Sequence, residues 1–197
     1  MQDAQKAISV VAIIPAAGRS GRMGTTKQLL HVDGKPMLLG IVDALLGGGV
    51  ARVVVVTNSE VREALPSLPL RVDIVLNDDP KTQMIESIRI GLLASPAADG
   101  YLVCPSDAAR ITAADVRRCV EAFAETPGHI VIATHDGTRG HPMIFPQSLA
   151  TVVLSAECDA GLNLLSRHRP QLVREVACDS PGTVSNVNTP ADYEKLK

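Results

Sequence analysis

Aromatic residues are scarce in this chain of 197 residues: it has no Trp, two Tyr and two Phe, which together make up 2% of the sequence. Proteins that bind single-stranded nucleic acid stack its bases on aromatic side chains, so this scarcity argues against that class. Net charge is also small, because 19 Lys and Arg face 21 Asp and Glu and leave a formal charge of -2. No overall positive field therefore attracts nucleic acid, and any polyanion must be bound locally by a few well-placed cations.

Paired cysteines and long apolar runs are missing as well. The four cysteines are far apart and form no CxxC pair, which favours reduced, buried thiols over a zinc site. The apolar stretch 7–17 is too short to span a bilayer and runs directly into a loop rich in Gly and Arg. We therefore expect this stretch to form a first β-strand, and we expect a cytoplasmic protein that binds neither a membrane nor nucleic acid.

The sequence alternates between short Val/Ile-rich runs and longer amphipathic segments. The short runs are typical of strands buried on both faces of a parallel sheet: Val10–Ile14, Arg52–Val56, Val72–Val75, Tyr101–Cys104 and Ile130–Ala133. The longer segments have apolar residues at helical spacing: Met37–Leu46, Met84–Leu93 and Ala113–Phe123. Two later runs, Met143–Phe145 and Leu172–Val176, are predicted as strands of a mixed part of the sheet.

This alternation predicts an α/β fold of the Rossmann-like kind, with a mostly parallel sheet flanked by helices in three α/β/α layers. Thr112 and Asp115 form a capping arrangement at the start of the third predicted helix. The length is enough for one well-cored domain and too small for two, so residues 1–197 are predicted to be a single domain.

A loop rich in glycine and arginine follows the first predicted strand, at the edge where open α/β sheets bind ligands. Gly18, Gly21 and Gly24 allow close approach of the backbone, and Arg22 and Lys27 add positive charge. The spacing fits neither the Walker pattern nor the dinucleotide-binding pattern Gly-x-Gly-x-x-Gly. The alternative is a flexible, solvated turn, but the composition favours a loop that binds a triphosphate.

The residues of this loop resemble a known signature. The segment Ala16-Ala17-Gly18-Arg19-Ser20-x-Arg22-Met23-Gly24-x-x-Lys27, followed by Gly34-Lys35-Pro36-Met37-Leu38, is similar to that of nucleotidyltransferases of the molybdenum cofactor group. The Ala-Ala-Gly form resembles the cytidylyltransferase branch, whereas the guanylyltransferase branch usually has Ala-Gly-Gly. The resemblance implies a fold like that of nucleotide-diphospho-sugar transferases, with this loop wrapped around a nucleoside triphosphate.

Carried over to this chain, the resemblance assigns roles in catalysis and nucleotide binding. Arg22, Lys27 and Asp107 are the expected catalytic residues, and Arg22 and Lys27 would hold the phosphates. The expected nucleotide-binding residues are Ala16, Ala17, Gly18, Arg19, Ser20, Gly21, Arg22, Met23, Gly24, Lys27, Asn77 and Ser87. On residue type alone, Asn77 reads as a turn residue and Ser87 as a helix-surface serine.

Candidate metal ligands lie far apart in the sequence. Asp107 matches the metal aspartate of the resembled family, and a hard oxygen ligand suits Mg²⁺. Asn186 and Asn188 occupy places where many cytidylyl relatives have aspartates, and alternation along a strand would put both on one face. Amide oxygens can bind Mg²⁺ without adding charge. The alternative is that these residues only initiate a helix near Pro190.

The acceptor side is expected at Gly140-His141-Pro142, which resembles the Gly-His-Pro of the cytidylyltransferase branch. Two departures put the substrate in doubt more than the reaction class. Gln83 stands where the family usually has Gly, and Ser106-Asp107-Ala108-Ala109 replaces the common Gly-Asp-x-Pro.

The resemblance thus implies Mg²⁺-dependent transfer of CMP from CTP to the phosphate of the molybdenum-pterin cofactor, with release of pyrophosphate. The N-terminal part would bind the nucleotide and the C-terminal part the acceptor, with a transient contact to a cofactor-receiving enzyme. Alternatives are GTP as donor, a sugar phosphate as acceptor, or a non-catalytic relative that binds nucleotide or cofactor. A phosphate monoester is largely ionised at neutral pH, with a second pKa near ~6, so no general base is required.

Overall fold

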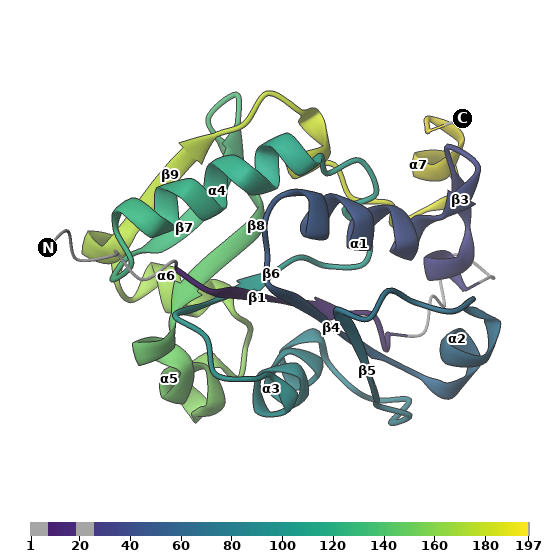
Figure 1. Ribbon diagram of the computed structural model, residues 1–197, viewed down its shortest axis with the longest axis horizontal. Coiled ribbons are helices and arrows are strands. Elements are labelled where there is room, and N and C mark those ends of the chain that lie inside the picture. The colour runs from purple at the N-terminus through teal and green to yellow at the C-terminus, as the bar shows by residue number, and fades with distance from the viewer. Residues whose placement is uncertain (1–7, 19–25, 197) are drawn as a thin grey trace, which may run out of the picture.

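The computed structural model describes residues 8–18 and 26–196. A seven-stranded sheet runs through its centre in the order β5-β4-β1-β6-β8-β7-β9 (Figure 1). The strands are β1 (Val10–Pro15), β4 (Arg52–Thr57), β5 (Val72–Leu76), β6 (Gly100–Val103), β7 (Ile130–His135), β8 (Thr138–Pro146) and β9 (Val173–Ala177). Neighbouring strands are parallel except that β8 is antiparallel to both β6 and β7. The predicted mostly parallel sheet with a mixed later part is therefore confirmed.

Helices cover both faces of the sheet. In Figure 1, α1 (Met37–Gly47) and α4 (Ala113–Glu125) lie on one face, and α3 (Met84–Ala94) and α5 (Ala150–Leu154) lie on the other. Successive side chains of β1 point to opposite faces of the sheet. Ala12 and Ile14 pack in the core under α1 and α4, whereas Val11 and Ile13 pack in the core that includes α3. The three-layer arrangement predicted from the sequence is confirmed.

Shorter elements complete the fold. A small hairpin, β2 (His31–Val32) and β3 (Lys35–Pro36), precedes α1. The other α-helices are α2 (Ser59–Ala64), α6 (Asn163–Arg167) and α7 (Pro190–Glu194). The 3-10 helices are η1 (Lys27–Leu29), η2 (Gln147–Leu149), η3 (Ala156–Cys158), η4 (Pro170–Leu172) and η5 (Pro181–Thr183). The sequence pattern did not predict α2, α5 and α6, because five or six residues are too few to show a helical period.

The predicted helix starts agree with the structure. The Thr112 hydroxyl accepts a hydrogen bond from the backbone N–H of Asp115 at 3.1 Å and so begins α4 as expected. The Thr189 hydroxyl caps α7 in the same way, by accepting from the N–H of Asp192 at 3.2 Å. The strand expected through Asn186 and Asn188 is wrong. Residues 185–188 are irregular, and the N–H of Val187 bonds to a loop carbonyl rather than to a sheet.

All four cysteines are buried and none forms a disulfide, as expected from their spacing. Burial raises the pKa of Cys104 and of Cys158 above that of an ordinary thiol. Over residues 8–18 and 26–196, no three His, Cys, Asp or Glu side chains are grouped so as to hold a metal ion. Within the same residues, every helix is too short or too polar to cross a bilayer.

Gly40 lies within α1, three residues after its start, and a Cβ added there would meet nothing within 4 Å. Alanine loses less conformational entropy than glycine on forming a helix, so we expect Gly40→Ala to raise the free energy of unfolding by about 0.5–1 kcal/mol. Urea denaturation measures this change. Gly49→Ala is a matched control, because its Cβ would also be free but its φ of +97° disfavours alanine. A gain in Gly49→Ala, or a loss in Gly40→Ala, would contradict this account.

Candidate nucleotide-binding site

The candidate site lies where β5, β4, β1 and β6 end side by side. Asn77 follows β5, Asn58 follows β4, the segment 16–18 follows β1, and Asp107 lies shortly after β6. Because β8 is antiparallel, its first half reaches the same edge, and the pairing of Val103 with Met143 carries His141 toward the start of the Asp107 loop. The sheet topology therefore brings most of the predicted residues that the structure describes to one edge of the sheet.

A cavity of about 290 Å³ opens at this edge. Five residues predicted for the site line it: Gly18, Lys27, Ser87, Asp107 and Asn188. Gln28, Thr82 and Met84 line it too, although the sequence had not assigned them to the site, and so does Gln83, which was noted as a departure from the family. The predicted loop residues Arg19, Ser20, Gly21, Arg22, Met23 and Gly24 lie outside the described residues.

Lys27 and Asp107, which both line the cavity, form an ion pair. The Lys27 Nζ donates to Asp107 Oδ2 at 3.0 Å, and each side chain is only 17% exposed. The other carboxylate oxygen, Oδ1, is buried and has no hydrogen-bond partner among the described residues. A buried acceptor without a partner is costly, and an anionic oxygen at a cavity is the ligand that Mg²⁺ prefers. Asp107 therefore fits a divalent cation site.

The two candidate asparagines are separated by the structure. Asn188 lines the same cavity as Asp107, and the backbone N–H of Val187 donates to the Asp107 carbonyl at 3.0 Å, which holds the two segments together. Asn186 lines a different hollow, together with Lys195. The expectation that both asparagines share one face is wrong, because the irregular backbone here does not alternate as a strand would.

Asn77 and Ser87, both predicted to bind the nucleotide, lie differently with respect to the cavity: Ser87 lines it and Asn77 does not. The Asn77 Nδ2 donates to Thr82 Oγ1 at 2.8 Å and to Ser87 Oγ at 3.3 Å, while its Oδ1 accepts from the N–H of Asp79 at 3.3 Å. Asn77 therefore uses its amide to fix the neighbouring hydroxyls and is not among the residues that line the cavity. Ser87 is 2% exposed and does line it.

Gly91, one helical turn after Ser87, explains the Ser-x-x-x-Gly spacing. A Cβ at Gly91 would lie 2.5 Å from Ile13 Cγ2 and 3.0 Å from Val56 Cγ2. Only glycine lets α3 pack this closely against β1 and β4, and that packing sets how far Ser87 enters the sheet edge.

His141 lies in the first half of β8, near Asp107. Burial lowers the pKa of His141 below its ordinary value, and the nearby Asp107 carboxylate opposes this shift only in part. The imidazole is therefore neutral at neutral pH, and its Nδ1 has no hydrogen-bond partner within the described part of the chain. The preceding Gly140 packs against backbone, since a Cβ there would lie 2.0 Å from the Thr183 carbonyl oxygen. Pro142, the third residue predicted here, is buried after a cis peptide bond.

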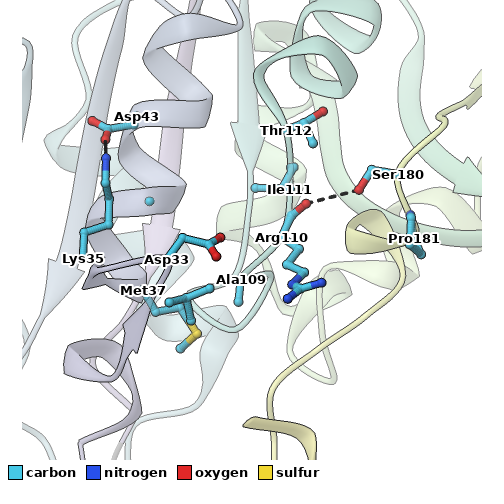
Figure 2. Close-up of a pocket in the computed structure, with 12 residues that line it drawn as sticks. Asp33, Lys35, Met37, Asp43, Ala109, Arg110, Ile111, Thr112, Ser180 and Pro181 are labelled. Atoms are coloured by element: carbon cyan, nitrogen blue, oxygen red, sulfur yellow. Dashed lines mark hydrogen bonds and ion pairs between the residues drawn. The ribbon is translucent and has the colours of Figure 1, made fainter. Parts of the chain in front are cut away.

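A larger hollow, of about 620 Å³, lies between the β2–β3 hairpin, α1 and residues 109–112 (Figure 2). None of the predicted site residues lines it. Figure 2 shows Lys35 paired with Asp43, at 2.6 Å, and Ser180 donating to the carbonyl of Arg110, at 3.2 Å. The charged residues that line this hollow are exposed. Among the described residues, the buried polar atoms that lack a hydrogen-bond partner belong to residues that do not line it. The chemistry therefore favours the smaller cavity.

The chain is similar to several known proteins over most of its length. Residues 12–175 match the MobA-like NTP transferase domain. A protein of Rhodopirellula baltica named "Probable molybdenum cofactor guanylyltransferase" is 28% identical over 194 residues, which cover 93% of this chain and 89% of that protein. The solved structure of Rv0371c from Mycobacterium tuberculosis H37Rv is 26% identical, covers 96% of this chain and 97% of that one, and has a TM-score of 0.83.

A third relative matches more strongly over a shorter length. The 2-C-methyl-D-erythritol 4-phosphate cytidylyltransferase of Nocardia farcinica is 41% identical over 116 residues, 56% of this chain and 48% of that protein. The chain thus spans about half the length of this curated relative. Since the domain match covers most of the chain, the protein belongs to the family of MobA-like NTP transferase domains.

Proposed function

We propose that this chain transfers CMP from CTP to the phosphate of a small acceptor, the molybdenum-pterin cofactor, in a Mg²⁺-dependent reaction that releases pyrophosphate. The observation that carries the proposal is the pairing of Lys27 with Asp107 at 3.0 Å, which leaves Asp107 Oδ1 without a described partner; both residues line the same cavity as Gly18. A fixed cation and a carboxylate able to hold a metal meet at the edge where the fold family binds nucleotides.

In the proposed reaction an oxygen of the acceptor phosphate attacks the α-phosphorus of the nucleotide. The bond from the α-phosphorus to the bridging oxygen breaks, and its electron pair leaves with pyrophosphate. The attacking phosphate is already ionised, with a second pKa near ~6, so no residue need remove a proton. The main obstacle is the repulsion between two anions.

The residues of the cavity address this repulsion. Lys27 places an ammonium group where negative charge moves onto the leaving pyrophosphate, and Arg22 is proposed to do the same. Asp107 and Asn188 would hold Mg²⁺, which supplies charge neutralisation between the phosphates when bound. We propose that His141, whose pKa is lowered by burial, faces the acceptor, where its neutral imidazole can hydrogen-bond to an anionic group.

The comparisons support two alternatives to these substrates. The relative from Rhodopirellula baltica, similar over most of both chains, supports GTP as the donor. The relative from Nocardia farcinica supports cytidylyl transfer to 2-C-methyl-D-erythritol 4-phosphate, a phosphate monoester of a sugar alcohol. We favour CTP because Ala16-Ala17-Gly18 has the cytidylyl form.

Release of pyrophosphate tests the proposal. The assay combines CTP, GTP, UTP or ATP with Mg²⁺ and with either the molybdenum-pterin cofactor or 2-C-methyl-D-erythritol 4-phosphate. We expect release with CTP and the pterin cofactor, and its loss when EDTA removes the metal. Preference for GTP or for the sugar-alcohol phosphate would replace the named substrate. Nucleotide binding without release in any combination would identify a non-catalytic binding protein instead.

A further inference from the structure

The backbone carbonyls after β1 are hydrogen-bonded by side chains from elsewhere in the chain. Gln28, in η1, donates from Nε2 to the carbonyl of Ala16 at 2.9 Å and to that of Gly18 at 3.2 Å. Two acceptors around one atom identify it as the amide nitrogen. The Gln28 side chain is 1% exposed, and its Oε1 has no partner among the described residues. The Gln28 side chain is thus buried at the cost of an unpaired oxygen, while its amide nitrogen makes two hydrogen bonds to the backbone.

Two residues at the end of β4, its last residue Thr57 and the following Asn58, bond the same segment. The Thr57 hydroxyl donates to the Ala16 carbonyl at 3.3 Å, and Asn58 Nδ2 donates to the Ala17 carbonyl at 3.3 Å. Thr57 is fully buried. Asn58 also caps α2, because its Oδ1 accepts from the N–H of Val61 at 2.9 Å. Three consecutive carbonyls are therefore each held by at least one side-chain donor.

These bonds fix the direction of the peptide groups. In a planar trans peptide the C=O and the following N–H point in opposite directions. The carbonyls of Ala16 and Ala17 point to Gln28, Thr57 and Asn58, so the N–H groups of Ala17 and Gly18 point the other way. Gly18 lines the cavity.

We infer that Gln28, Thr57 and Asn58 are positioning residues that turn the N–H groups of Ala17 and Gly18 toward acceptor atoms of the bound nucleotide. This inference rests on the proposed function, because it assigns the outward N–H groups to a nucleoside triphosphate. Thr57 and Asn58 do not line the cavity, whereas Gln28 does, and all three side chains act through the backbone carbonyls that they bond. They therefore set nucleotide affinity more than the rate of the chemical step.

Single substitutions separate this role from general stability. Gln28→Met keeps the length of the side chain, removes both donor bonds and removes the unpaired oxygen. Thr57→Val keeps the shape without the hydroxyl, and Asn58→Asp keeps the cap on Val61 without the donor. For each variant we expect the Kd for Mg-CTP to rise at least about fivefold, and tenfold or more for Gln28→Met, which loses two bonds. We expect kcat to change less than KM.

The readouts distinguish the possible outcomes. Gln28→Met should melt at or above the wild-type temperature while binding CTP more weakly, a combination that a purely structural role does not produce. Gln147→Glu, at an exposed glutamine in η2, is the control and should bind as wild type does. Folded variants with the wild-type Kd and KM would overturn the inference.

Failure of the proposed function is recognised separately. If the wild-type protein binds none of CTP, GTP, UTP and ATP, that proposal fails. The anchoring is then judged from the amide resonances of Ala17 and Gly18 in ¹⁵N–¹H NMR spectra of the ligand-free protein. These resonances should shift in Gln28→Met and Thr57→Val, and unchanged resonances would overturn the anchoring itself.

Discussion

Asp107→Asn should reduce turnover by at least about 10²–10³-fold while the protein remains folded. The substitution preserves the shape of the side chain but removes the charge that pairs with Lys27 and the anionic oxygen left without a described partner. A neutral amide binds Mg²⁺ more weakly than a carboxylate, so the anions in the cavity are less well neutralised. Steady-state pyrophosphate release at saturating CTP and Mg²⁺ measures the loss.

The control for this substitution is Asp179→Asn. Asp179 is also paired with a cation, Arg118, but its side chain is 82% exposed, and it does not line the cavity. It should keep wild-type turnover, and circular dichroism melts should show both variants folded. If Asp107→Asn retained turnover close to that of Asp179→Asn, the carboxylate would not be the metal ligand of the reaction.

Much of the candidate site could be located from the sequence, because buried parallel strands are recognisable as apolar runs and their carboxyl ends lie at one edge of the sheet. Runs such as Val53–Val56 are buried on both faces, so sequence alone located them within a residue or two. Once β1, β5 and β6 were placed, their carboxyl ends had to meet, and Asp107 and the loop after β1 had to converge. Asn77 was placed at the right edge for the same reason, although its amide is occupied by Thr82 and Ser87.

The features that the sequence could not predict lie in irregular backbone, where side-chain directions follow no repeating pattern. Residues 185–188 belong to no strand, so alternation gave the wrong direction for Asn186 and a shared face that does not exist. The bonds from Gln28, Thr57 and Asn58 also escaped prediction, because a side chain that bonds a distant carbonyl leaves no pattern in the sequence. The one available signal was polar residues directly after the apolar run of β4.

A close backbone contact at Gly140 also leaves no pattern in the sequence. It predicts a large loss of stability when Gly140 is replaced by alanine. A Cβ at Gly140 would lie 2.0 Å from the carbonyl oxygen and 2.7 Å from the carbonyl carbon of Thr183. The segment cannot simply move away, because a Cβ at Gly182 would lie 2.0 Å from the Arg110 carbonyl oxygen on another side of it. Thr183 itself is fully buried. β8 and residues 181–184 therefore fit together only with glycine at position 140.

Gly140→Ala should lower the free energy of unfolding by about 2–3 kcal/mol, as overpacking does in buried positions. For a chain of this size that corresponds to a fall in Tm of roughly 5–10 °C, which calorimetry detects readily. Gly128→Ala is the matched control, because its Cβ would meet nothing within 4 Å, and it should change stability by less than about 0.5 kcal/mol.

Gly140→Ala should also weaken catalysis, because residues 181–184 are followed closely by Val187 and Asn188. The N–H of Val187 donates to the Asp107 carbonyl at 3.0 Å, and Asn188 lines the cavity. A shift of this segment moves both candidate metal ligands relative to each other. We therefore expect Gly140→Ala to require more Mg²⁺ for half-maximal pyrophosphate release at a temperature where it is still folded. A Gly140→Ala variant as stable as Gly128→Ala, with an unchanged Mg²⁺ requirement, would show that the contact with Thr183 does not require glycine at position 140.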